Sequence, residues 1–282
     1  MILGQRMALA IAVLALGGSA TNAALGQGTA RAQVQPAVNA RVIGTFVMVA
    51  RVTAAENVRG ERVGQRLVRR WRIVSTRCAG GVCELLRLDR ERSAGRHDHL
   101  TLRRVAAGRY SGRGVFYAAL SCRGRIYRHG SRVPYRLTLT VERATTVEGI
   151  AFARRIAATY ENRGRSDATP CPLGPSHDAA RYRGRARSAV PSPPTGSFST
   201  LVDSTGDTAS FRDTSRPGHG GAVIVARAWQ FGDPASGAAD SSTATAPVHR
   251  FSAPGSYSVT LTVVDANGLY STSTNAVIVP GP

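Results

Sequence analysis

Apolar and polar residues alternate along the last third of the chain, as they do in strands that bury one face. In the clearest run, Tyr257, Val259, Leu261 and Val263 share one face, whereas serine and threonine occupy the other. Six or seven short strands without a helical period predict a β-sandwich for this part of the chain. The other stretches that read as strands are residues 208–211, 222–229, 245–251 and 269–279.

The same alternation runs through residues 41–187. It is strongest from Val133 to Val141, where apolar residues alternate with arginine and threonine. Seven or eight antiparallel strands must protect their edges, and a closed or nearly closed barrel does so, with a second sandwich as the alternative. The expected fold class is therefore all-β, with a barrel-like domain before the sandwich. Weaker strands are expected at residues 42–52, 67–74, 82–88, 100–105, 110–118 and 151–160.

A longer motif crosses the predicted sandwich. Its residues are Trp229, Phe231, Gly232, Asp233, His249, Phe251, Gly255, Tyr257, Val259, Leu261, Val263 and Asp265. In order and spacing the motif resembles the PKD domain, an immunoglobulin-like module of cell-surface and secreted proteins. The resemblance covers residues 195–280 and implies extracellular spacing, adhesion or binding rather than chemistry.

The resemblance implies structural roles for these residues. Trp229 and Tyr257 are expected to be buried anchors of the core. The sequence departs from the family at Gln230, where aspartate is usual, and at Pro234, where glycine is usual. An acidic function is therefore not expected at this rim.

Charge divides the chain into two unlike parts. All 37 basic residues are arginine. Residues 41–187 hold 31 of them against 11 acidic residues, a balance of +20, whereas residues 195–282 hold 4 against 6, a balance of −2. A field of this strength attracts polyanions. The alternative is a solvated outer sheet face, for which Arg69, Arg70 and Arg72 around Trp71 are the example.

The N-terminus has the three-part pattern of a secretory signal. Arg6 supplies a positive charge, Met7 to Leu16 is apolar, and a small, polar stretch ends at Ala23, after which cleavage is expected, with Ala20 and Ala32 as the alternatives. A retained anchor is the alternative. The apolar run is too short to span a membrane, which takes about 20 residues. No later apolar segment is long enough either, so no span is expected in the mature chain.

Composition then divides the chain. Prolines concentrate between the two β domains, where they favour an extended spacer that holds the domains apart. The expected parts are a signal peptide at 1–23, a flexible segment at 24–40, the basic domain at 41–187, a proline-rich linker at 188–197 and the sandwich at 198–280.

The four cysteines lie in the basic domain and allow three pairings. Cys78 and Cys83 flank a four-residue loop with two glycines, so they are expected to bond to each other. This leaves Cys122 to bond with Cys171. Export favours disulfides over a zinc site.

Candidate catalytic groups are few. On a strand, His97 and His99 of His97-Asp98-His99 would point to the same side like metal ligands, but a solvated hairpin tip is favoured. Ser176-His177-Asp178 has triad residue types, yet three neighbours do not form a triad by themselves, and a loop is expected there. We expect no catalytic, cofactor-binding or metal-binding residue and no enzyme activity.

The sequence therefore predicts a secreted or cell-surface binding or adhesion protein that needs no cofactor. Its expected partners are extracellular polysaccharide, wall polymer or protein, and not intracellular nucleic acid. The basic domain would contact polyanions such as wall polymers or acidic polysaccharide. A barrel that carries a small ligand is the first alternative, and an accessory part of a secreted hydrolase system is the second.

Overall fold

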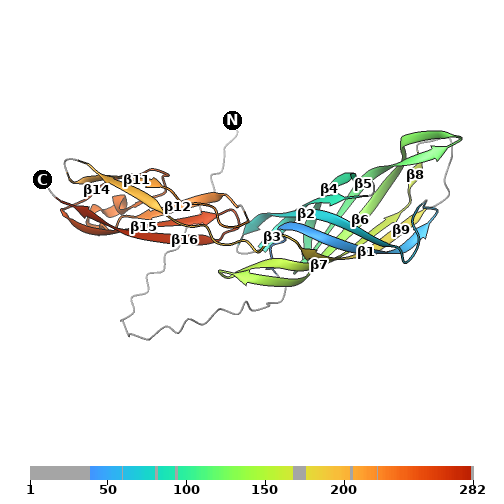
Figure 1. Ribbon diagram of the computed structural model, residues 1–282, viewed down its shortest axis with the longest axis horizontal. Coiled ribbons are helices and arrows are strands. Elements are labelled where there is room, and N and C mark those ends of the chain that lie inside the picture. Colours follow the sequence, from blue (N-terminus) through green and yellow to red (C-terminus); the bar gives the residue numbers. More distant parts are fainter. Residues whose placement is uncertain are drawn as a thin grey trace. The chain divides into compact units, whose positions relative to one another are not determined.

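The computed structural model describes residues 39–58, 60–79, 82–92, 95–167, 176–203, 206–220 and 222–280. The predicted signal peptide, residues 1–23, lies outside them. Strands make up nearly all of the regular structure (Figure 1). In the described part of the chain, no helix has both the length and the apolar character needed to cross a membrane.

Eight strands of the basic domain form a closed antiparallel barrel (Figure 1). Each strand pairs with the next in the order β1-β2-β3-β4-β5-β6-β7-β9, and β9 pairs back with β1, while β8 adds two residues beside β6. Ring closure confirms the predicted barrel and satisfies the edges that an open sheet would expose. The bounds are β1 Gly44–Glu56, β2 Arg66–Ala79, β3 Val82–Glu91, β4 His97–Ala106, β5 Arg109–Cys122, β6 Arg125–Val147, β7 Ile150–Arg163, β8 Ser166–Asp167 and β9 His177–Ala186.

The loop predicted at Ser176-His177-Asp178 is wrong, because β9 begins there and closes the ring between β1 and β7. Arginines alternate with inward residues along β9, but several of the inward residues are small. At Gly184, an added Cβ would lie 2.0 Å from Met48 Sδ, so Met48 fills the space that a larger residue would occupy. Because the inward residues of β9 are small, its apolar alternation is weak, and the strand could not be predicted from hydrophobic periodicity.

Much of the barrel interior is filled with apolar side chains. All eight barrel strands contribute inward residues to one cluster, in which Phe46, Trp71 and Leu102 are fully buried. Burying a large apolar side chain stabilises the fold by about 1.5–3 kcal/mol. The Trp71 ring packs against Tyr182 at a centroid distance of 4.9 Å. Beyond this cluster, the interior becomes polar.

A disulfide joins Cys78 to Cys83, which are directly opposite in the β2–β3 ladder, with Cα atoms 3.9 Å apart. Cys122, the last residue of β5, is also disulfide-bonded. Its predicted partner, Cys171, lies outside the described residues.

We expect Cys122 to be bonded to Cys171, because Cys78 and Cys83 already form a disulfide with each other. By the chain-entropy account, a bridge that closes about fifty residues stabilises the fold by roughly 4 kcal/mol. Peptide mapping without reduction should recover Cys122 and Cys171 in one linked pair. Thiol labelling of either cysteine in unreduced, denatured protein would contradict this pairing.

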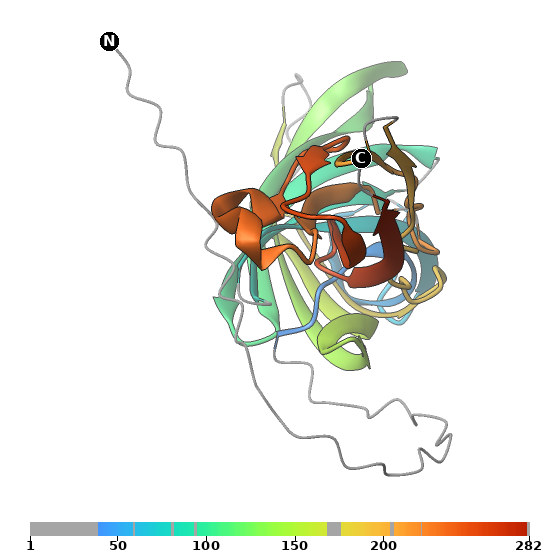
Figure 2. The ribbon, with the colours of Figure 1, turned by 90° about the vertical axis from the view of Figure 1, so that its left-hand side faces the viewer.

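The C-terminal part is a sandwich of two antiparallel sheets, β10-β11-β14 and β13-β12-β15-β16, drawn in yellow to red in Figure 2. Phe198 and Phe211 of the first sheet and Trp229, Leu261 and Val263 of the second form one buried cluster, which confirms the predicted sandwich. The bounds are β10 Phe198–Val202, β11 Thr208–Asp213, β12 Ile224–Gln230, β13 Ser241–Ser242, β14 Val248–Arg250, β15 Gly255–Asp265 and β16 Tyr270–Val279, with the 3-10 helix η3 Pro234–Asp240 before β13.

The proline-rich segment is bonded near both of its ends. Ser188 Oγ accepts a hydrogen bond from Thr45 N at 3.0 Å, which ties it to the barrel. Ser192 N donates to His219 O at 2.9 Å, and Thr195 exchanges two backbone hydrogen bonds with Arg216. Much of residues 188–197 therefore belongs to one domain or the other.

Candidate functional site

Arginines gather on the outside of the barrel over β2, β1, β9 and β7, and we call this group the outer arginine face. Arg51 lies directly opposite Arg66 on one side and Arg181 on the other. Arg185 lies opposite Arg155. Neighbouring strands are about 4.8 Å apart and alternate residues along a strand about 6.7 Å apart, so the charges form a regular array. The face comprises Arg51, Arg66, Arg155, Arg181, Arg183 and Arg185.

The outer arginine face has few carboxylates to balance it. Among the described residues, its one ion pair joins Arg183 Nε to Glu142 Oε1 at 3.7 Å. Like charges directly opposite each other destabilise a ladder. An external anion would relieve this repulsion, so the face has the electrostatics of an anion-binding surface.

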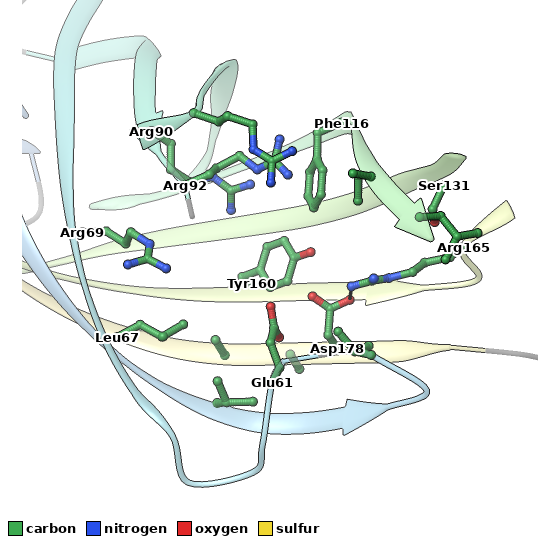
Figure 3. A pocket seen from close by; sticks show the side chains of 18 of the residues that line it. Glu61, Leu67, Arg69, Arg90, Arg92, Phe116, Ser131, Tyr160, Arg165 and Asp178 are labelled. Atoms are coloured by element: carbon green, nitrogen blue, oxygen red, sulfur yellow. Dashed lines mark hydrogen bonds and ion pairs between the residues drawn. The ribbon is translucent and has the colours of Figure 1, made fainter. Parts of the chain in front are cut away.

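Inside the barrel, a cavity of about 470 Å³ opens where β1, β3 and β7 end and β2 and β9 begin. Figure 3 shows its charged side chains around Tyr160, with Leu67 and Phe116 among the apolar ones. Among the residues that the structure describes, five arginines and three carboxylates line it. We call it the mouth cavity.

Arg90 lines the mouth cavity as half of a buried ion pair with Asp98. Arg90 Nε and Nη2 donate to Asp98 Oδ1 and Oδ2 at 2.9 and 2.7 Å, and the two side chains are 5% and 10% exposed. Tyr135 donates its hydroxyl to Asp98 Oδ2 at 2.7 Å, and the guanidinium lies 4.5 Å from the centroid of the Tyr135 ring. Burial raises the pKa of Asp98, but the Arg90 and Tyr135 hydrogen bonds and the Arg90 charge lower it more, so the net shift is downward.

A second ion pair, between Arg165 Nη2 and Asp178 Oδ1 at 2.7 Å, also lines the mouth cavity. Burial and the nearby Asp178 charge raise the pKa of Tyr160, although its hydroxyl makes no hydrogen bond of normal geometry with a described residue. Ser131, which is 3% exposed, likewise has an Oγ without a hydrogen-bond partner in the described part of the chain. The cavity wall thus holds buried polar atoms that are not satisfied.

Three further charged groups of the cavity, Arg69, Arg92 and Glu61, form no ion pair with the described residues. Arg92 Cζ lies 3.4 Å above the centroid of the Phe116 ring. Burial and then Asp178 raise the pKa of Glu61, Arg165 and Arg69 lower it, and the net shift is upward. The guanidinium charge here exceeds the carboxylate charge.

The solvated-face interpretation is wrong for Arg69. Leu67, Arg69 and Trp71 share the inward face of β2, whereas Arg70 and Arg72 are exposed on the outer face. Residues two apart on a strand point the same way. The apolar Trp71 was therefore the sequence signal that Arg69 faces the interior.

The hairpin tip predicted at His97-Asp98-His99 is the start of β4. The Nδ1 atoms of His97 and His99 lie 2.8 and 3.9 Å from Asp89 Oδ1, and Asp98 turns the other way, toward Arg90. Within the residues that the structure describes, no group of three or more histidine, cysteine or acidic side chains is placed to hold a metal.

The triad residue types at Ser176-His177-Asp178 are not brought together. His177 faces Glu56 and Glu161, with closest nitrogen to oxygen distances of 3.6 and 3.7 Å. Asp178 points into the barrel and pairs with Arg165. Alternation along the strand thus places neighbouring residues on opposite faces.

In the sandwich, the motif residues form a closed polar cluster. Asp233 Oδ2 accepts hydrogen bonds from His249 Nε2 at 3.2 Å and Ser252 N at 2.9 Å, and the Asp233 and His249 side chains are each 2% exposed. Burial raises the pKa of Asp233, but the hydrogen bonds from Ser252 and His249 lower it more. The His249 ring stacks on Phe231 at 4.3 Å. These groups stabilise the domain and leave little access for a substrate.

The remaining motif residues support turns and the core. Gly232 has a φ of 73°, and an added Cβ would lie 2.7 Å from Ser258 O. Asp265 Oδ1 accepts the N–H groups of Asn267 and Leu269, each at 2.8 Å. Trp229, Phe251, Val259, Leu261 and Val263 are buried, and Gly255 begins β15. The prediction that Tyr257 is a buried anchor is wrong, because its ring is half-buried and packs against the core from the edge, with the hydroxyl donated to Ala253 O at 2.6 Å.

The two departures from the family lie around η3. Gln230 Nε2 donates to Asp240 Oδ2, and Asp240 Oδ1 accepts from Asp233 N at 2.6 Å. Pro234 begins η3, where a missing N–H costs nothing. Both residues are thus accommodated by local bonds.

Residues 193–279 match the PKD domain family. Similar solved structures include the PKD1 domain of Vibrio anguillarum Epp, with 27% identity over 33% of this chain and 100% of that chain and a TM-score of 0.29. The PKD1 domain from the Vibrio cholerae metalloprotease PrtV shows 31% identity over 31% of this chain and 98% of that chain, with a TM-score of 0.27. Among curated proteins, none matches the chain.

Proposed function

Because residues 193–279 form a PKD domain, we propose that the chain is an extracellular, non-catalytic binding protein. Its barrel contacts acidic polymers, such as wall polymers or acidic polysaccharide, through the outer arginine face. The PKD domain acts as an interaction or spacer module. The observation that carries this proposal is the register that sets Arg66, Arg51 and Arg181 side by side across three strands.

The chemistry of the outer arginine face fits a polymer better than a single small anion. Its charges extend over four strands instead of converging on one point. Each guanidinium offers planar donors that match carboxylate, sulfate and phosphate groups. Binding would also release counterions from the polymer, which gives affinity without requiring a deep pocket.

Binding without catalysis is supported by how four of the buried acidic and basic groups are engaged. Asp233 and His249 are enclosed in the sandwich core. In the barrel, Asp98 and Asp178 are each held by an arginine. A general base must reach the proton that it abstracts, and carboxylates held in this way are poorly placed to do so.

We expect the triple variant Arg51→Gln, Arg66→Gln, Arg181→Gln to lose most of its binding to polygalacturonate, an acidic polysaccharide. The slope of log affinity against log salt should become shallower by about 2, since each arginine that contacts the polymer releases less than one counterion. Titrations of the full chain between about 50 and 500 mM salt would measure both quantities. Neutral dextran serves as the uncharged polymer control.

The matched control is Arg103→Gln, Arg109→Gln, Arg113→Gln, which removes the same charge from exposed positions on β4 and β5. It should bind nearly as the unmodified chain does. An equal loss in both triple variants would assign the effect to net charge and contradict a defined face. Binding that does not change with salt would also contradict the proposal.

A further inference from the structure

We propose that the mouth cavity binds a small organic anion with an apolar body, held by Arg69 and Arg92. This site lies inside the barrel and does not depend on the polymer contact proposed for its outer face. A volume of about 470 Å³ falls within the usual range for small-molecule sites, about 300–1,000 Å³.

The charge that would recognise the anion is that of Arg69 and Arg92. Arg90 and Arg165 line the same cavity but are already paired with Asp98 and Asp178. Arg69 bonds the Val68 carbonyl, and Arg92 stacks on Phe116. Neither forms an ion pair with a carboxylate of the described residues, and the carboxylate charges that act on them from a distance are Glu61 on Arg69 and Asp98 on Arg92. A guanidinium stacked face-on against a ring keeps its N–H edge available for a carboxylate or sulfonate.

A second observation is the unsatisfied polar surface of the cavity. Ser131 Oγ is buried, lines the cavity and has no hydrogen-bond partner among the described residues. A buried hydroxyl without a partner destabilises the protein, and a ligand or water in the cavity that bonds it would remove this cost.

The apolar side chains of the cavity wall indicate the chemical nature of the ligand's uncharged part. Leu67, Phe116, Leu120 and Ala180 line the cavity. They suit an aromatic or short aliphatic body and not a sugar or an inorganic ion. Figure 3 shows Leu67 and Phe116 on different sides of the Tyr160 ring, so apolar contacts are available on more than one side of the cavity.

Three carboxylates of the lining would oppose an anion, namely Glu61, Glu91 and Asp178. Asp178 is paired with Arg165 and Glu91 accepts the Arg70 N–H, whereas Glu61 forms no ion pair with a described residue. Burial, and next Asp178, raise its pKa, while Arg165 and Arg69 lower it, with a net upward shift. It therefore accepts a proton more readily than an exposed glutamate does. Proton uptake at Glu61 would relieve repulsion when an anion enters.

The test compares two fluorescent probes of similar shape, anilinonaphthalene sulfonate and phenylnaphthylamine, which lacks the sulfonate. In the full chain, Arg69→Gln, Arg92→Gln should weaken sulfonate binding by about tenfold to a hundredfold, as expected for lost charge-assisted hydrogen bonds. Binding of the neutral probe should change by less than about twofold, because its body contacts the unchanged apolar wall.

Two controls keep the result interpretable. Arg70→Gln, Arg72→Gln removes equal charge from the outer face of the same strand and should leave both affinities nearly unchanged. Ala118→Leu narrows the cavity and should weaken both probes. The proposal is overturned if the inward and outward pairs of variants weaken sulfonate binding equally, or if Ala118→Leu leaves both affinities unaltered.

Discussion

Trp229→Ala should destabilise the PKD domain by about 3–5 kcal/mol, enough to unfold it at moderate temperature. The Trp229 ring packs against Phe198 and Phe211 at centroid distances of 5.2 and 5.6 Å, which joins the two sheets. Its Nε1 donates to Ala244 O at 2.8 Å. Truncation would leave a large cavity and an unsatisfied carbonyl at once.

Calorimetry of the full chain measures this effect. The transition of the PKD domain should move to much lower temperature or disappear, while that of the barrel persists. Tyr270→Ala, at a residue that is 53% exposed, is the control and should change stability by no more than about 0.5 kcal/mol. A near-unchanged melting profile for Trp229→Ala would show that the sheets do not depend on this anchor.

Asp98→Ala should cost the barrel about 3–5 kcal/mol, because it leaves the Arg90 charge buried without a partner. Tyr135 would also lose the acceptor of its hydroxyl. Denaturant titration gives the loss directly. Asp89→Ala is the matched control, since that carboxylate pairs with His97 at the surface and should contribute about 1 kcal/mol or less.

The effect of Asp98→Ala should depend on pH. The pKa of Asp98 is lowered in the folded barrel, so its contribution is fully present above the ordinary aspartate pKa of about 3.9. It is lost as pH falls through the lower, folded-state value. The difference between the two proteins should therefore shrink below about pH 4.

A compensated variant separates the buried charge from packing. Replacing the whole network, with Arg90→Met, Asp98→Leu, Tyr135→Phe, should restore much of the lost stability, because apolar groups of similar volume often replace a buried ion pair without cost. If the triple variant is as unstable as Asp98→Ala, the loss comes from packing and not from the stranded charge.

Much of the architecture could be predicted from the sequence, because strand alternation and turn residues mark the strands. In the sandwich, apolar and polar residues alternate from Tyr257 to Val263, and this alternation predicts which side chains are buried. Val259, Leu261 and Val263 are fully buried. The barrel was predicted because many antiparallel strands need protected edges. β9 was missed because Ala180 and Gly184 are too small to mark an inward face.

The alternation of inward and outward residues also predicts some of the side chains that line the mouth cavity. Arg69 shares a face with Trp71, and Arg90 shares one with Leu88, so their inward direction follows from local periodicity. Local periodicity does not determine which carboxylate pairs with each arginine. Asp98 reaches Arg90 because β3 and β4 pair in that register, and Asp178 reaches Arg165 only after β9 enters the ring.

The sequence by itself determined the two β domains, the motif of the sandwich and the concentration of positive charge before the linker, because these depend on composition and on residues close in the chain. Only the tertiary structure decided which arginines face outward in an array and which line the mouth cavity with their partners. Those arrangements depend on ring closure and strand register, which set distances between residues far apart in sequence.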